Sequence, residues 1–135
     1  MTGVSRHGKM PHMPTKRPFR EASSGATRDV NTDKLVYDKF QHPLVVKRFA
    51  EYMNANREMQ DGSTRAGDNW YKGFPRDWLI ESMHRHYMDT WLHAKGFEAH
   101  ANEDIESALC GILFNAQAML LEVLLDRDVE ELENW

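Results

Sequence analysis

The chain of 135 residues contains a single cysteine, Cys110, so neither an intrachain disulfide nor a cysteine-based zinc site can form. It also lacks a run of about 18 or more consecutive apolar residues, the signature of a membrane span, because Glu122 interrupts its most apolar stretch. Its basic N-terminus does not resemble a targeting helix, since three prolines interrupt it and no apolar segment follows. These absences predict a cytoplasmic protein without membrane contact.

Charge is unevenly distributed along the chain, although 41% hydrophobic and 28% charged residues are typical of a soluble globular domain. Residues 1–28 carry six Arg or Lys and one acid, whereas the chain as a whole has a net charge of −4. Residues 1–24 are rich in Pro, Gly, Ser and His and show no apolar periodicity, which predicts a disordered basic arm. Residues 25–135 are expected to form a single all-α domain.

Three helices are expected, at residues 43–60, 75–95 and 102–125. Proline suits the first helical position at the start of the first two, and Asn102 is a candidate N-cap for the third. The short connection between the second and third predicts antiparallel neighbours. No strand pattern is evident, so the fold class is an all-α compact helical bundle with a long antiparallel helix pair and a mobile N-terminal arm.

Each of the last two helices carries an apolar face. At about 100° per residue, five side chains of the second helix fall on one face. They are Ile80, Met83, Tyr87, Trp91 and Ala94. The face of the third helix is broader and comprises Ile105, Leu109, Ile112, Leu113, Leu120 and Leu124.

A polar stripe on the second helix comprises Ser82, His86, Asp89 and His93, with Glu81 and Arg85 beside it. Imidazole and carboxylate groups one turn apart can share a divalent ion, or one can orient the other as a general base. The simpler interpretation is a solvated helix face. Helix geometry places Glu81 far from the connection, so we expect Glu81, Arg85 and Asn115 to form a second level of any cleft.

The third helix carries a stripe of small and acidic residues centred on Gly111. Glycine inside a helix costs about 1 kcal/mol relative to alanine, which predicts that a neighbouring backbone or a ligand approaches closely there. Glu103 and Asp104 lie at the start of this helix. They could compensate the helix dipole, or, facing the polar stripe, hold Mg²⁺ or Mn²⁺ together with Asp89.

Several motifs together resemble the phage-associated dATP/dGTP diphosphohydrolase-like domains, which are related to the all-α MazG nucleotide pyrophosphohydrolases. The resemblance spans residues 23–125 and rests on "GATRD", "NWYKG", "RH" and a late asparagine. These motifs fall on Gly25, Ala26, Arg28, Asp29, Asn69, Trp70, Lys72, Gly73, Arg85, His86 and Asn115.

The resemblance implies metal-dependent hydrolysis of a purine deoxynucleoside triphosphate to the monophosphate and pyrophosphate, in a host cytoplasm if the chain is phage-encoded. Mg²⁺ or Mn²⁺ would neutralise the phosphates and activate water. The implied catalytic residues are His86, Asp89 and Glu81, and the implied metal ligands are Asp89, Glu103 and Asp104. The implied nucleotide-binding residues are Arg28, Lys34, Asn69, Trp70, Lys72, Arg85 and Asn115.

Two other functions fit the same residues. A non-catalytic protein that sequesters a nucleotide would keep Trp70, Asn69 and the cations without needing metal-binding carboxylates. An interaction protein would instead use the basic arm on nucleic acid or on an acidic partner. Helices that are apolar on several sides also suit a homo-oligomer, which MazG-like domains often form.

Overall fold

The structure is a computed structural model that describes residues 18–30 and 33–133. Its internal contacts divide the chain into two units, residues 1–42 and 43–135. This division differs from the boundary at residue 25 expected from the sequence. Most of the expected arm, residues 1–24, lies outside the described residues, as does Trp135.

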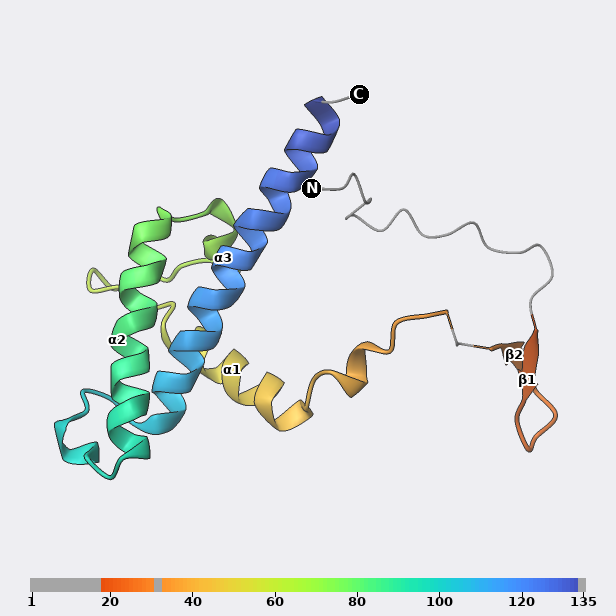
Figure 1. The fold of residues 1–135 in the computed structure, drawn as a ribbon, viewed down its shortest axis with the longest axis horizontal. Helices are drawn as coiled ribbons and strands as arrows, with labels where there is room; N and C mark the ends of the chain where they lie inside the picture. Colours follow the sequence, from red (N-terminus) through yellow and green to blue (C-terminus); the bar gives the residue numbers. More distant parts are fainter. Residues whose placement is uncertain (1–17, 31–32, 134–135) are drawn as a thin grey trace. The chain divides into compact units, whose positions relative to one another are not determined.

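The first unit contains a β-hairpin, which the sequence pattern did not predict (Figure 1). Strand β1 (Phe19–Glu21) pairs antiparallel with β2 (Thr27–Asp29). Gly25 makes the turn possible, because its φ of +94° is one that residues with a Cβ rarely adopt. A short 3₁₀ helix, η1 (Tyr37–Lys39), follows. The three-residue strands are too short for an alternating pattern to stand out, which is why no strand was predicted.

Helix α1 (Pro43–Ala55) opens the second unit and begins at the predicted proline. It ends five residues earlier than expected, because the Asn56 side-chain amide donates to the carbonyl of Tyr52 at 2.8 Å and competes with the backbone there. The chain then makes a tight turn closed by an antiparallel bridge between Glu58 and Thr64. A 3₁₀ helix, η2 (Asn69–Lys72), leads into the next helix.

The long helix pair is α2 (Arg76–Ala94) and α3 (Ile105–Glu133), joined by the short 3₁₀ helix η3 (Glu98–His100). Helix α3 begins three residues later than expected, because Asp104 rather than Asn102 caps it. Asp104 Oδ1 accepts the Ser107 N–H at 2.8 Å. The helix also continues eight residues beyond the expected end at Leu125.

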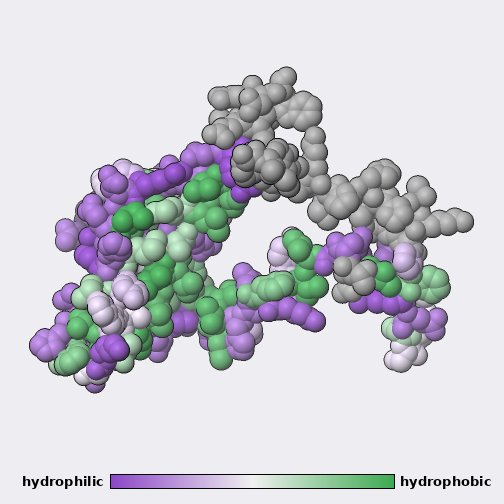
Figure 2. Space-filling view, in the orientation of Figure 1, coloured by the Kyte–Doolittle hydropathy of each residue, from purple (hydrophilic) through white to green (hydrophobic). Residues whose placement is uncertain are grey.

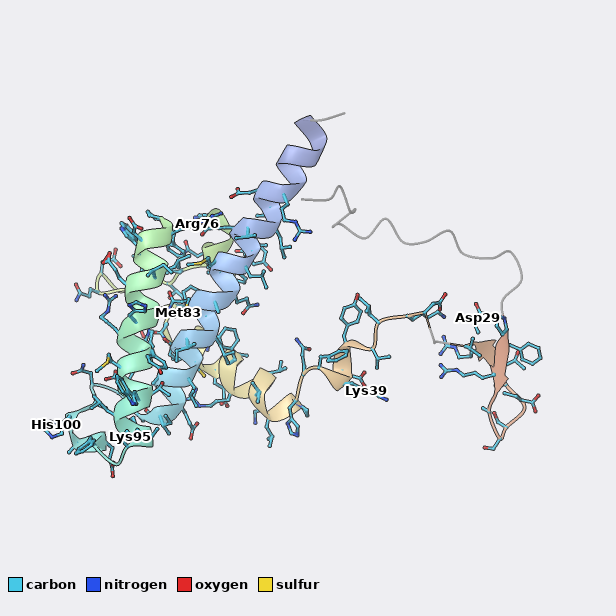
Figure 3. The ribbon with its side chains drawn as sticks, viewed as in Figure 1. Asp29, Lys39, Arg76, Met83, Lys95 and His100 are labelled. Atoms are coloured by element: carbon cyan, nitrogen blue, oxygen red, sulfur yellow. The ribbon has the colours of Figure 1, made fainter. Side chains whose placement is uncertain are left out.

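The two long helices pack antiparallel, as the sequence predicted (Figure 1). Arg76 at the start of α2 reaches Asp126 near the far end of α3 at 2.6 Å. Ser82 meets Asn115 at 3.1 Å, and His86 meets Glu103 at the opposite end. Figure 3 shows Arg76 and Lys95 at opposite ends of α2, with Met83 between them. The helical fold class is therefore confirmed.

The faces in contact are the polar and small ones, not the apolar ones. Asp89 of the polar stripe is only 6% exposed, so the solvated-face interpretation of that stripe is wrong. Ala108, Gly111, Asn115 and Ala118 of the small-residue stripe are buried. On the opposite faces, most of the expected apolar residues are exposed: Ile80, Tyr87, Trp91, Ile105, Leu109, Leu113, Leu120 and Leu124. Figure 2 shows hydrophobic residues at the surface of this unit.

The buried hydrophobic core of the described residues is correspondingly small. It consists of Leu79, Ala108, Cys110 and Ala118. Burial raises the pKa of the Cys110 thiol, which keeps it neutral in this core.

One segment of α3 is a candidate membrane span, although it contains no run of 18 consecutive apolar residues. Ile105–Arg127 is long and apolar enough by length and composition alone, although only 28% of its most apolar window is buried. Its partner α2, however, exposes charged residues such as Glu81 and Arg85 along the same pair. Placing these charges in hydrocarbon would be costly, so the pair is consistent with a soluble protein.

Gly111 explains how the two helices approach so closely. A Cβ at this position would overlap the His86 ring. A close approach at Gly111 is therefore confirmed, but the approaching group is the imidazole side chain of His86, not a neighbouring backbone or a ligand.

We expect Gly111→Ala to destabilise the protein. Alanine gains about 1 kcal/mol in helix propensity relative to glycine. The added methyl group would, however, displace the His86 ring, and overpacking of this kind typically costs about 1–3 kcal/mol. Denaturant unfolding should show a lower free energy of unfolding. In a His86→Ala background the same substitution should be neutral or stabilising, which a double-mutant cycle measures. Gly67→Ala, whose Cβ would meet nothing within 4 Å, is the control.

We also expect the chain to self-associate through the exposed apolar face of α3. Leu109 and Leu113 are 46% and 45% exposed and lie one turn apart on this face. If a second copy covers this face, apolar side chains are removed from water, which favours the association. Light scattering after size exclusion should give a multiple of 15.8 kDa.

The variants Leu109→Glu and Leu113→Glu place a charge on this face, so each should have the mass of a monomer. Gln60→Glu adds the same charge at an exposed polar position outside α3 and should leave the mass unchanged. A monomeric unmodified protein at micromolar concentration would contradict the expectation.

Candidate functional site

The second unit contains a partly open cavity of about 420 Å³, which lies in the size range of small-molecule sites. Its lining comes from α1, the turn after it, η2, α2 and α3. The lining residues with polar or aromatic side chains are Tyr52, Asn54, Asn56, Arg57, Arg65, Asn69, Trp70, Phe74, Ser82, His86, Phe114 and Asn115. Four residues predicted from the sequence are thereby brought together: Asn69, Trp70, His86 and Asn115.

An aromatic cluster forms one wall of the cavity and is fixed to α3. Trp70 packs edge-on against Phe114, with ring centroids 6.2 Å apart. The rings of Phe74 and Phe114 also pack edge-on, with centroids 6.4 Å apart, and the Phe74 backbone N–H donates to Glu122 Oε2 at 3.1 Å. Trp70 is therefore mounted on a loop that a carboxylate of α3 holds in place.

Asn115 is the most deeply placed polar side chain of the site. It is 2% exposed, and its Nδ2 donates to the Gly111 carbonyl at 2.8 Å and to Ser82 Oγ at 3.1 Å. Both N–H groups of the Asn115 side chain thus bind other residues of the protein, which fixes the orientation of its carbonyl oxygen.

Two arginines of the cavity, Arg57 and Arg65, were not predicted. Both flank the bridged turn after α1, which the sequence indicated only as a break in the helical pattern. The signal that could have found them is their spacing around "DGS", a turn sequence that brings flanking residues opposite each other. Arg57 Nε donates to the Arg65 carbonyl at 2.7 Å, so the two residues are fixed together.

His86 is held by Glu103. Its Nδ1 is hydrogen-bonded to Glu103 Oε1. Since an ionised carboxylate only accepts, Nδ1 carries the proton, and in the neutral ring Nε2 is an acceptor. His86 also lines the cavity, and Nε2 has no hydrogen bond to any residue of the described ranges. This arrangement can act as a general base.

Glu103 links several groups at the end of the helix pair. Its backbone carbonyl pairs with His93 Nε2 at 2.7 Å. Burial raises the pKa of the Tyr52 phenol, and the negative charge of Glu103 raises it further. Tyr52 therefore stays a neutral hydroxyl that can donate a hydrogen bond within the cavity.

The three carboxylates expected to hold a metal ion have separate partners. Asp89 Oδ1 accepts the Asn102 N–H at 3.0 Å, Glu103 holds His86, and Asp104 caps α3. Hydrogen bonds from Ser107 hold the pKa of Asp104 below its usual value. Among the described residues, no group of three or more His, Cys, Asp or Glu side chains could hold a metal ion. As arranged here, these residues do not fit a single Mg²⁺ or Mn²⁺ centre.

A second cavity of about 310 Å³ adjoins the first along α2 and shares Phe74, Ser82, Phe114 and Asn115 with it. Glu81 and Arg85 line this second cavity. The structure thus places Glu81, Arg85 and Asn115 at one level, as helix geometry predicted.

The remaining predicted residues lie elsewhere. Lys72 is exposed at the end of η2 and lines neither of the two cavities described. Arg28 lies in β2, and Lys34 follows it in the first unit. Both residues belong to the first unit, whereas all residues that line the two cavities belong to the second unit.

No family model, no curated protein and no solved structure matches this chain. The resemblance to nucleotide pyrophosphohydrolases therefore stays a prediction that rests on the sequence motifs.

The role of Asp89 can be tested separately from any chemistry. Asp89→Ala leaves the Asn102 N–H without its acceptor, so we expect the free energy of unfolding to fall by about 1–3 kcal/mol. Asp89→Asn keeps an acceptor oxygen and should lose less. Glu81→Ala, at an exposed position of the same helix, is the control. Equal stability of all three variants would contradict a structural role for Asp89.

Proposed function

We propose that this chain binds a purine nucleoside phosphate in the cavity between α1, η2, α2 and α3. The observation that carries the proposal is the composition of the lining. It combines an aromatic wall, four asparagines and two arginines with His86, and no Asp or Glu is among the described residues that line it. Such a surface suits a ligand with an aromatic base and negative charge.

Trp70 and the amides account for the base. An indole in a wall of the cavity offers an aromatic surface on which a purine can stack. Asn69 carries a carbonyl and an amide group, which match the paired donors and acceptors on a purine edge, and the carbonyl oxygen of Asn115 can accept a further hydrogen bond. The "NWYKG" motif, which contributes to the resemblance above, supplies two of these three residues.

A second candidate function, hydrolysis of the bound nucleotide to the monophosphate and pyrophosphate, is favoured by the His86–Glu103 pair. A histidine whose Nδ1 is held by a carboxylate presents Nε2 as a base that can take a proton from an attacking water. No metal enters this argument, because the carboxylates expected to bind one have other partners. A metal requirement stays a prediction that the assays below test.

Titration calorimetry with deoxynucleotides and ribonucleotides tests the binding proposal. Trp70→Ala should weaken purine nucleotide binding about 5- to 150-fold, the equivalent of about 1–3 kcal/mol of stacking. Trp70→Phe keeps an aromatic face and should lose less. Trp91→Ala removes an exposed tryptophan that lines neither described cavity and is the control. The proposal is wrong if no purine nucleotide binds to the unmodified protein.

Mass spectrometry of the same mixtures, with Mn²⁺ and with EDTA, separates retention from turnover. Hydrolysis predicts monophosphate and pyrophosphate, and His86→Asn should abolish them while nucleotide binding persists. Intact nucleotide under every condition would instead favour the sequestering function and dismiss hydrolysis.

A further inference from the structure

The turn after α1 places two guanidinium groups on one side of a small antiparallel ribbon. Glu58 and Thr64 form the bridge, and the Arg65 N–H donates to the Arg57 carbonyl at 2.8 Å. Arg57 and Arg65 are thus the next pair along the ribbon. Residues directly opposite each other in an antiparallel pair project their side chains to the same face. That face lines the cavity.

The turn itself is firmly closed. The Met59 N–H donates to the Ser63 carbonyl at 2.8 Å, and Asp61 Oδ1 accepts the Ser63 N–H at 2.9 Å. Gly62 supplies the positive φ, +85°, that the turn needs. The positions of the two arginines are therefore set by backbone hydrogen bonds rather than by contact with a ligand.

The charges of the two arginines are not neutralised within the described part of the chain. Neither guanidinium forms an ion pair with a described residue, and no described carboxylate lines the cavity. Arg57 is held through Nε and through Nη1, which donates to Asn54 Oδ1 at 3.2 Å. Its other N–H groups, and the side chain of Arg65, remain to bind an anion. Like charges directly opposite in a ribbon are destabilising, and an anion between them removes that cost.

We propose that Arg57 and Arg65 form the phosphate subsite of the cavity and bind phosphate oxygens directly, without a divalent cation. This inference rests on the proposed function, because it assumes that the ligand of the cavity is phosphorylated. Guanidinium groups match phosphate geometry through paired hydrogen bonds, and such charge-assisted bonds are roughly twice as strong as neutral ones. The resemblance implied nucleotide binding by Arg28, Lys34, Lys72 and Arg85, and the proposed subsite adds Arg57 and Arg65 to these cations.

The test compares three probes by calorimetry in EDTA: inorganic pyrophosphate, a purine nucleoside without phosphate, and the corresponding triphosphate. Arg65→Gln should weaken pyrophosphate and triphosphate binding about 10- to 100-fold and leave nucleoside binding unchanged. Arg57→Gln should act likewise, and Arg65→Lys should restore only part of the affinity. Lys47→Gln removes a positive charge from an exposed position of α1 and is the control.

Arg65 is the decisive position, because its side chain makes no hydrogen bond that shapes the turn, whereas Arg57 holds the Arg65 carbonyl. Circular dichroism and the melting temperature of each variant show whether the turn has survived. Triphosphate affinity that is unchanged in Arg65→Gln, or that disappears in EDTA, overturns the phosphate subsite.

The probes also separate the two proposals. Pyrophosphate binding that depends on Arg65, with no binding of nucleoside or nucleotide, keeps the anion subsite and dismisses the nucleotide function. Nucleoside and nucleotide binding of equal strength, both insensitive to Arg65, keeps the base site and dismisses the phosphate subsite. Absence of binding by all three probes dismisses both.

Discussion

The second unit depends on one contact, the His86 ring of α2 against the bare backbone of α3 at Gly111. Because no Cβ stands there, the two helices can approach through their polar and small faces. The same contact directs Nδ1 of His86 to Glu103 and places Ser82 within hydrogen-bonding distance of Asn115. The polar interior of the pair and its exposed apolar faces are therefore two consequences of one close approach.

This arrangement separates two kinds of charge. The three carboxylates that were expected to bind a metal ion lie near the connection between α2 and α3, and each has a partner. Asp89 accepts a backbone N–H, Glu103 is hydrogen-bonded to His86, and Asp104 caps α3. The cations of the cavity, Arg57 and Arg65, come from the turn after α1 and have no acidic partner among the described residues. The anion subsite proposed above rests on this separation, and the three carboxylates serve structure and orientation.

Much of the second unit follows from local patterns. The prolines indicated where the first two helices begin, and the glycine inside α3 indicated a close approach. The loop with Trp70 and the helix that carries His86 both contribute to one cavity. Helix ends were less accurate, because side-chain hydrogen bonds decide them: Asn56 ends α1 early, and Asp104 starts α3 late.

The sequence by itself determined that the chain is helical and that two long helices run antiparallel. These features depend on residue periodicity and on short connections, which are local. Only the tertiary structure decided which helix faces meet and that Arg57 and Arg65 join the cavity. Periodicity identifies the faces of a helix but not the partner of each face, because that depends on how closely two backbones can approach in space.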